Sequence, residues 1–317
     1  MNQATQAALD SLKDHMDKSG HRDSDLYLAR LSAIIRSYAD RWNNDMEDYE
    51  VAHVEKTYHA PIVNLDNGKK TKFLASGKLD VIARSRINKN KIILIDHKSS
   101  SGEWSTDKHQ HLLFGSQGLQ YAYLAHANGL GITHIMFDVL QKSLHRKGKN
   151  ESYPELQDRI YGIYSEDHSK FQRLTVPVIK DSVADHVNNL YHISKEIDLE
   201  SKGGIHIPST NSCFAFGNNC TYLPICSGMS DQNDETEWKT ESNKHKELDL
   251  EDDLDPSLLM TNSRVNCYLS CRRQHNFKYN LGLAPVRENL PESLFLGTAI
   301  HIALENYWKT LMIKGEN

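Results

Sequence analysis

Hydrophobic and polar positions along the chain follow two periods, and each period predicts one kind of element. Apolar residues three and four positions apart lie on one face of a helix. This spacing predicts helices over residues 4–18, 23–44, 108–128, 181–199, 262–281 and 298–313. Alternating or short unbroken apolar runs predict strands over residues 51–63, 71–85, 91–96, 132–141 and 171–179. Strands interspersed with helices predict an α/β fold, in which helices flank a central mixed β-sheet.

The third predicted strand lies in the sequence KIILIDHKSS at residues 91–100, and its end is unusual. Four apolar residues in a row predict a strand buried on both faces, and Asp96, His97 and Lys98 follow directly. Side chains two residues apart in a strand point to the same face, so Asp96 and Lys98 lie side by side. Asp80 lies near the middle of the preceding strand. If the two strands are neighbours, Asp80 and Asp96 converge.

Two converging carboxylates repel each other unless a cation lies between them. Oxygen ligands favour a hard divalent cation such as Mg²⁺ or Mn²⁺ over zinc. The ammonium of Lys98 would then neutralise a phosphate oxygen or position a water, which is the chemistry of metal-assisted phosphodiester hydrolysis. The alternative is a surface ion pair at a strand end, which Asp96 and Lys98 alone leave open.

Composition and charge narrow the class of protein. The 317 residues are 38% hydrophobic, which allows a sizeable core, and we find no apolar run long enough for a transmembrane helix. The first residues are polar and amphipathic, unlike a signal peptide, so we expect a cytoplasmic protein with no membrane partner. Residues 229–255 hold eleven acids and three bases, and we expect this segment to be disordered. The rest of the chain is net positive, so a basic cleft for nucleic acid remains possible.

The two carboxylates belong to a larger pattern. Asp80 in SGKLD and the DHK of residues 96–98 are followed by QGLQYAYL, in which Gln117 and Tyr121 lie one helical turn apart. Near the end of the chain, the sequence LGTAIHIALENYW carries His301. Together these motifs resemble the PD-(D/E)XK nuclease superfamily, and in particular its RecB-like exonuclease branch.

The resemblance implies a restriction-endonuclease-like core and a role for each matching residue. It assigns Mg²⁺ or Mn²⁺ to three side chains, namely His301, Asp80 and Asp96. Lys98 would position the water or stabilise the phosphate, Gln117 would orient the site, and Tyr121 would line it.

The activity that the resemblance implies is that of a metal-dependent DNA exonuclease acting on single strands or DNA ends. Its setting would be DNA repair or recombination, or phage DNA metabolism. A structure-specific endonuclease of the same superfamily and a non-catalytic DNA-binding protein on this fold are the alternatives. The sequence contains no G-x-x-x-x-G-K-[ST] motif, so any unwinding would need a helicase or recombination partner.

Five cysteines in a chain of this length do not predict a disulfide scaffold. Four of them resemble the ligands of an iron–sulfur cluster found in a subset of the same branch: Cys213, Cys220, Cys226 and Cys271. The resemblance implies a [4Fe–4S] cluster, although four thiolates would also bind zinc. The spacing of Cys213 and Cys220 is looser than in many relatives, and Arg272 stands where the family often has proline. Cys267 is left over as a core or helix-surface thiol.

The order of the motifs differs from that of the family, in which the first cysteine and the histidine helix come first. Here both come last, so the order is rotated and the chain resembles a circular permutation. We therefore expect three parts: a nuclease core at residues 1–228, an acidic linker at 229–255, and the permuted N-terminal part of the same domain at 256–317. In that case His301 lies beside the two aspartates, and the chain ends lie near each other. The joining of two adjacent coding pieces in this order is an alternative origin.

Overall fold

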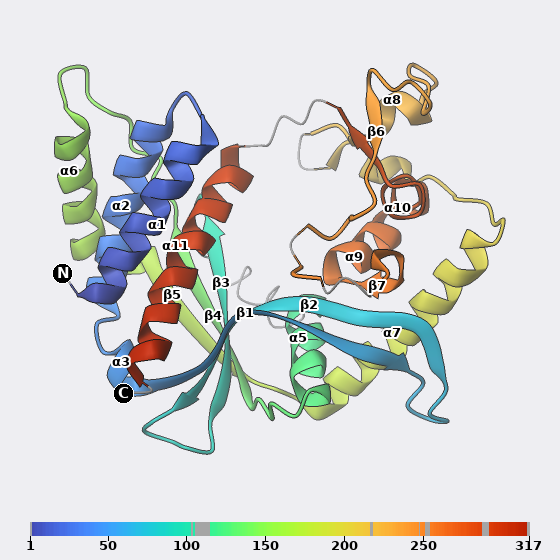
Figure 1. The fold of residues 1–317 in the computed structure, drawn as a ribbon, viewed down its shortest axis with the longest axis horizontal. Helices are drawn as coiled ribbons and strands as arrows, with labels where there is room; N and C mark the ends of the chain where they lie inside the picture. The colour runs from blue at the N-terminus through green and yellow to red at the C-terminus, as the bar shows by residue number, and fades with distance from the viewer. Residues whose placement is uncertain are drawn as a thin grey trace.

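The computed structural model describes residues 2–315, apart from residues 103, 105–114, 216–217, 247, 251–253 and 287–291. Its centre is a six-stranded sheet (Figure 1). The strands are β1 (Tyr49–Val63), β2 (Lys70–Ser85), β3 (Ile92–Ser100), β4 (His134–Gln141), β5 (Phe171–Pro177) and β7 (Leu259–Met260). β1 to β5 follow one another across the sheet in chain order, and β7 pairs with β2.

Both strand orientations occur in this sheet. β1, β2 and β3 pair antiparallel, β3 and β4 pair parallel, and β4 and β5 pair antiparallel. β2 is long enough for two partners on one side, because residues 81–84 pair with β3 while Leu74 and Ala75 pair in parallel with β7. The sheet is therefore mixed, as the sequence predicts.

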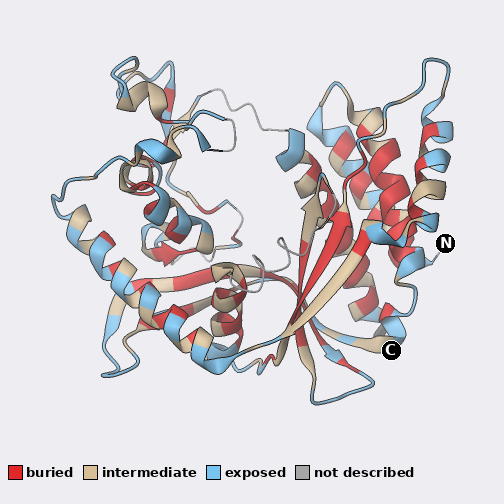
Figure 2. Ribbon diagram, turned by 180° about the vertical axis from the view of Figure 1, so that it is seen from behind, coloured by how far each residue is buried: buried red, intermediate tan, exposed pale blue. Residues whose placement is uncertain are grey.

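Helices cover both faces of the sheet. The α-helices of the described residues are α1 (Gln3–Ser19), α2 (Ser24–Arg41), α3 (Asp45–Asp48), α5 (Ser116–Ala127), α6 (Tyr153–Glu166), α7 (Lys180–Ser201), α8 (Leu223–Cys226), α9 (Asn262–Ser270), α10 (Arg272–His275) and α11 (Glu292–Gly315), of which α8 lies apart from the sheet. One core joins α1, α2, α6 and α11 to one face, and the other joins α5, α7 and α9 to the opposite face. The buried residues of the sheet separate the two groups of helices (Figure 2). The predicted fold class, a central mixed sheet flanked by helices, is confirmed.

The apolar run of β3 explains why helices are needed on both sides. Ile93 and Ile95 belong to the first core, whereas Leu94 belongs to the second. All three side chains are at most 1% exposed. A strand whose consecutive residues are all apolar has apolar side chains on both faces, so both faces must be covered.

The last part of the chain completes this core. Within α11, Trp308 and Leu304 are fully buried in the first core, together with residues of α1 and α2. β7 adds a strand to the sheet at the other end of β2. The described ends of the chain lie on the same side of the molecule, where α1 packs on α11 (Figure 1). The predicted distance between the terminal residues 1 and 317 concerns residues outside the described part.

The acidic segment at residues 229–255 differs from the disordered tether that the sequence predicts. Its strand β6 (Trp238–Thr240) pairs with β8 (Leu283–Pro285), and Trp238 is 6% exposed. The Trp238 ring stacks on Tyr222 with centroids 5.6 Å apart. Net charge gave the wrong expectation for the described residues of this segment, because a few apolar side chains anchor an otherwise polar stretch.

Two predicted helices also differ from the structure, and one helix was not predicted. Helix α6 was omitted, although Ser152 and Glu155 form a reciprocal capping box that its sequence signals. The helix predicted over residues 262–281 is broken at Cys271, whose extended φ of −159° ends α9 and begins α10. The helix predicted from residue 108 is described only from Ser116, because residues 105–114 are outside the described part.

We find no helix among the described residues that is long and apolar enough to cross a membrane.

Candidate functional site

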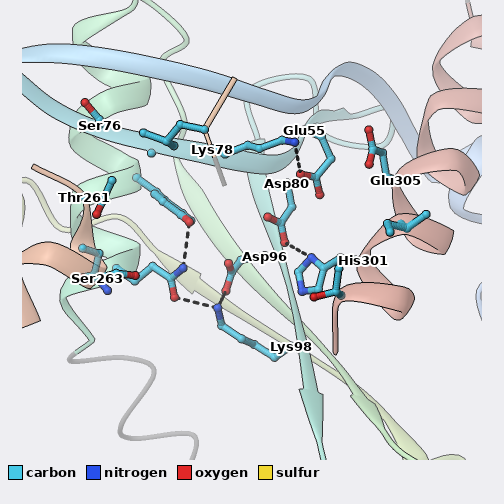
Figure 3. Close-up of a pocket in the computed structure, with 17 residues that line it drawn as sticks. Glu55, Ser76, Lys78, Asp80, Asp96, Lys98, Thr261, Ser263, His301 and Glu305 are labelled. Atoms are coloured by element: carbon cyan, nitrogen blue, oxygen red, sulfur yellow. Dashed lines mark hydrogen bonds and ion pairs between the residues drawn. The ribbon is translucent and has the colours of Figure 1, made fainter. Parts of the chain in front are cut away.

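The residues selected for nuclease chemistry line one pocket of about 400 Å³ (Figure 3). They are Asp80, Asp96, Lys98, Gln117, Tyr121 and His301. Strands β2 and β3 supply the charged residues, α5 supplies the glutamine and tyrosine, and α11 supplies the histidine. The structure therefore brings all six side chains together from opposite ends of the chain.

Lys98 is held at the centre of a continuous chain of polar contacts. Its Nζ lies 2.8 Å from Asp96 Oδ2 and donates to Gln117 Oε1 at 2.8 Å. Gln117 Nε2 in turn donates to the Tyr121 hydroxyl at 2.9 Å. Burial opposes the charge on Lys98, but the Asp96 carboxylate prevails and raises the pKa of Lys98 above its usual value. The ammonium is therefore charged and fixed in direction.

Asp80 is held against the end of β3 by the backbone. The N–H of His97 donates to Asp80 Oδ2 at 2.8 Å. His301 approaches from α11, and its Nδ1 lies 3.8 Å from the same carboxylate oxygen. Burial lowers the pKa of His301, although Asp80 opposes the shift. A neutral imidazole beside a carboxylate offers one nitrogen ligand and one oxygen ligand to a divalent cation.

Glu55 is a third acidic residue of the pocket, and its place there was not predicted from the sequence. One ligand atom each from Glu55, Asp80 and His301 lie within 4.8 Å of one another. Glu55 has a φ of 48°, a left-handed conformation that is rare for residues other than glycine. The neighbouring pairs Val54–Val81 and Lys56–Leu79 bracket Glu55 and Asp80, so the two acids lie on adjacent strands.

Charge repulsion is strong on this side of the pocket. Burial and the nearby Asp80 carboxylate raise the pKa of Glu55 to about 8. Burial also raises the pKa of Asp96, against the influence of Lys98. Lys78 Nζ, 3.5 Å away, partly offsets the charge of Glu55. Carboxylates held this close are stabilised by a cation that binds between them.

A buried polar network supports the pocket from behind. His97, whose backbone holds Asp80, faces Asp138 on β4 with Nδ1 3.5 Å from Oδ2. Asp138 is completely buried, and it accepts hydrogen bonds from Tyr38 at 2.5 Å and from Arg173 at 3.2 Å. Arg173 also forms a bidentate pair with Asp45. These partners come from four separate elements, so sequence spacing gave no signal for them.

Close approach of β2 and α5 explains the glycine in the SGKLD motif. A Cβ at Gly77 would lie 2.9 Å from Tyr121 Cε1. Any side chain there would push the tyrosine ring out of place. One turn of α5 away from Gln117 lies the fully buried Gln120, which donates to the carbonyls of Ser76 and Met260 and so ties β2 to β7.

Four cysteines line a second, small cavity: Cys213, Cys220, Cys226 and Cys271. Cys271 lies at the break between α9 and α10, where the backbone N–H groups of Ser209 and Gln274 point at its sulfur from 3.4 and 3.5 Å. Burial raises the pKa of Cys220 and Cys226. The fifth cysteine, Cys267, is not among the lining residues, and burial raises its pKa to about 11. The four sulfurs chosen from the sequence thus share one cavity.

Comparison with known proteins agrees with this architecture. A family model of the PD-(D/E)XK nuclease superfamily matches residues 260–317. The matched region includes Cys271 and the helix of His301. A comparison with curated proteins gives no match. The central mixed sheet flanked by helices is consistent with a restriction-endonuclease-like PD-(D/E)XK fold, and the match to this superfamily indicates a nuclease.

Proposed function

We propose that this protein is a metal-dependent deoxyribonuclease whose catalytic centre is the pocket around Asp80, Asp96, Lys98 and His301. The observation that carries the proposal is the position of Lys98. Its ammonium is fixed by Asp96 and Gln117 at the edge of a group of acids and a histidine. A fixed cation next to a metal-binding set is what phosphodiester hydrolysis requires.

The donor set fits a hard divalent cation such as Mg²⁺ or Mn²⁺. Asp80 and His301 would hold it together with Glu55, since one ligand atom of each lies within 4.8 Å of the others, and Asp96, which lines the same pocket, would be the further ligand. When bound, the ion would polarise the phosphate and lower the pKa of a water. Lys98 would orient that water or stabilise the developing negative charge, while Gln117 and Tyr121 keep its ammonium in position.

Exonuclease action on single strands or DNA ends is the finer part of the proposal. It is supported by the motif set of the RecB-like branch, from Asp80 through Tyr121. We also propose a cytoplasmic protein that acts in DNA repair, recombination or phage DNA metabolism, with a helicase or recombination protein supplying any unwinding.

Digestion of labelled DNA tests the proposal directly. DNA labelled at the 5′ or the 3′ end should be degraded with Mn²⁺ or Mg²⁺ and stay intact with EDTA. Closed circular single strands should resist, because they have no ends. Cleavage of circles would replace the exonuclease by an endonuclease of the same superfamily. Failure to cut any DNA with either metal would contradict the nuclease itself and favour a non-catalytic DNA-binding protein.

We also propose that the chain is one nuclease domain with a rotated motif order. Residues 1–228 and 256–317 would form it together, with residues 229–255 as the connection. The support is the contribution of the last segment to the common core, through β7 in the sheet and α11 against α1. RecB-like members with the usual motif order would then have the same fold, with the ends of the chain at a different place in it.

We propose that the cysteine cavity holds a [4Fe–4S] cluster, with zinc as the alternative. Zinc bound tetrahedrally at about 2.3 Å places its sulfurs about 3.8 Å apart. Among the residues that the structure describes, the cysteines do not form a set of three sulfurs within 4.8 Å of one another. A [4Fe–4S] cluster is a larger body that holds four thiolates further apart. Cys213, Cys220, Cys226 and Cys271 would be its ligands.

Replacing Cys220 by serine should remove this cluster. Protein purified without air is expected to be brown with broad absorption in the blue, and Cys220→Ser should lose the colour and unfold more easily. Cys267→Ser is the matched control, because Cys267 does not line the cavity, and it should stay brown. A colourless protein with one zinc per chain would overturn the iron assignment.

Replacing Glu55 by glutamine should weaken metal binding. The change keeps the shape but removes a carboxylate that could bind the ion beside Asp80 and His301, so Mn²⁺ affinity should fall about 10–100-fold. Glu50→Gln, at an exposed position on the same strand, is the control. Calorimetric titration with Mn²⁺ would measure both. Equal affinities for the two variants would remove Glu55 from the metal centre.

A further inference from the structure

The acidic segment reaches the mouth of the proposed catalytic pocket. Leu248 is 5% exposed and forms part of the pocket wall. The next residue, Asp249, donates its backbone N–H to Thr57 Oγ1 at 3.1 Å. Its carboxylate lies 3.4 Å from Lys78 Nζ. A part of the chain with a strong negative charge therefore touches the rim of a pocket that would take a polyanion.

The contact is anchored on the side that precedes it. His245 is fully buried, and its ring stacks on Tyr279 with centroids 5.4 Å apart. His245 Nδ1 also lies 3.4 Å from the hydroxyl of Thr261, another residue of the pocket wall. Buried His245 and Leu248 thus place Asp249 at a defined point on the rim.

Lys78 differs from Lys98 in what it offers to a ligand. Lys98 is committed to Asp96 and Gln117 inside the pocket. Lys78 lies at the rim, between Glu55 at 3.5 Å and Asp249 at 3.4 Å. The Asp249 side chain is 76% exposed, and an ion pair with so exposed a partner is weak and easily exchanged.

A phosphate could replace Asp249 with little rearrangement. A carboxylate and a phosphate are both anions that accept hydrogen bonds from an ammonium group. Thr57 Oγ1, which now accepts from the backbone of Asp249, could donate its own hydrogen to a phosphate oxygen. Residues 246–255 contain six acids and one base, so displacement of Asp249 would also move negative charge away from the rim.

We propose that Lys78 and Thr57 form a phosphate-binding subsite for the nucleic-acid backbone at the rim of the pocket, which Asp249 occupies in the absence of nucleic acid. This inference rests on the proposed function, since it takes nucleic acid as the ligand. The acidic segment then acts as an intramolecular competitor. DNA has to displace Asp249 before its backbone can lie across the rim towards Lys98.

The test measures DNA binding without cleavage. A fluorescent single-stranded oligonucleotide is titrated in EDTA at low and moderate salt, and polarisation gives the Kd. Asp249→Asn should tighten binding about 3–10-fold at low salt, because the competitor loses its charge. Lys78→Met should weaken binding and make it less sensitive to salt by about one phosphate contact. Asp66→Asn and Lys69→Met, both exposed in the β1–β2 loop, control for net charge.

The double variant decides between a local subsite and a general charge effect. Asp249→Asn should give no gain in the Lys78→Met background, because the site for which it competes is gone. An equal gain in both backgrounds, or a gain of the same size from Asp66→Asn, would overturn the proposal.

Failure of the subsite and failure of the nuclease are distinguishable. A wild-type protein that digests DNA while Asp249→Asn leaves the Kd unchanged contradicts the subsite alone. A protein that never cuts DNA, but binds it more tightly after Asp249→Asn, contradicts the nuclease and keeps the subsite.

Discussion

Replacing Lys98 by methionine should lower the rate of DNA cleavage about 10³-fold, because it removes the ammonium that the proposed mechanism places at the reacting phosphate. Lys98 is bonded to Asp96 and to Gln117 at 2.8 Å each, so its position is set before substrate arrives. Methionine keeps much of the stem but cannot stabilise developing negative charge. DNA affinity should change far less than the rate, since Lys98 would interact most strongly with the transition state.

Two further variants test whether the loss of rate is specific to the ammonium of Lys98 and its position. Gln117→Leu leaves the ammonium but releases it from one partner, so we expect a smaller loss, about 10–100-fold. Lys170→Met removes a lysine that directly precedes β5 and does not line the pocket, so this variant should cut DNA normally. Single-turnover cleavage of an end-labelled strand measures all three. Near-normal cleavage by Lys98→Met would remove the D-x-K motif from catalysis.

The elements that the sequence predicted best are those whose signal is local. The unbroken run from residue 92 to 95 specified a strand covered on both faces, and the structure covers it on both faces. Spacing of one helical turn between Gln117 and Tyr121 placed both on one side of α5, where they bond to each other. Such patterns depend on neighbouring residues only, so one chain is sufficient to read them.

Glu55 shows where local patterns fail. Its strand is predicted to alternate, but Val51 and Val54 are three residues apart, and the pairing of β1 with β2 shifts between Val51 and His53. An irregularity in a strand turns later side chains to the other face. The break in alternation is the sequence signal of this irregularity, and a search for a simple period of two overlooks it. The left-handed φ of Glu55 follows from the fold and has no signature in the sequence.

The buried charges around Arg173 were out of reach for a different reason. Tyr38, Asp45 and Asp138 come from separate elements, and nothing in their spacing joins them. Burial of charge is decided by packing, and a sequence pattern treats such residues as solvated. The burial of Trp238 was not predicted for the same reason, because a single apolar side chain can anchor a segment whose average composition predicts disorder.

Replacing Arg173 by methionine should lower the free energy of unfolding by about 3–5 kcal/mol at neutral pH. Arg173 is 9% exposed and neutralises both Asp45 and Asp138, which lie deep in the core. Without it, both carboxylates stay buried and lose the guanidinium that pairs with them, and only Asp138 keeps a neighbouring imidazole, that of His97. The surface pair of Arg159 and Glu151 provides the control, and Arg159→Met should cost about 1 kcal/mol or less. Urea unfolding followed by circular dichroism measures both variants.

The dependence on pH separates lost charge compensation from lost packing. Burial acts to raise the pKa of Asp138, but Arg173 and the other groups around it lower it to about 2 in the native protein. Its contribution to stability is therefore present above the ordinary aspartate pKa of about 3.9 and lost as the pH falls towards 2. In Arg173→Met the largest lowering influence on both acids is gone, so the pKa of Asp45, which burial already raises, should rise further, and that of Asp138 should rise although His97 and Tyr38 still lower it. The stability of the variant then decreases as the pH rises from about 4 to 7, so its deficit should be smaller at pH 4.5 than at pH 7. A deficit of equal size at both pH values would assign the loss to packing. The charges of this network would then act independently of the charges of the pocket, to which His97 connects it.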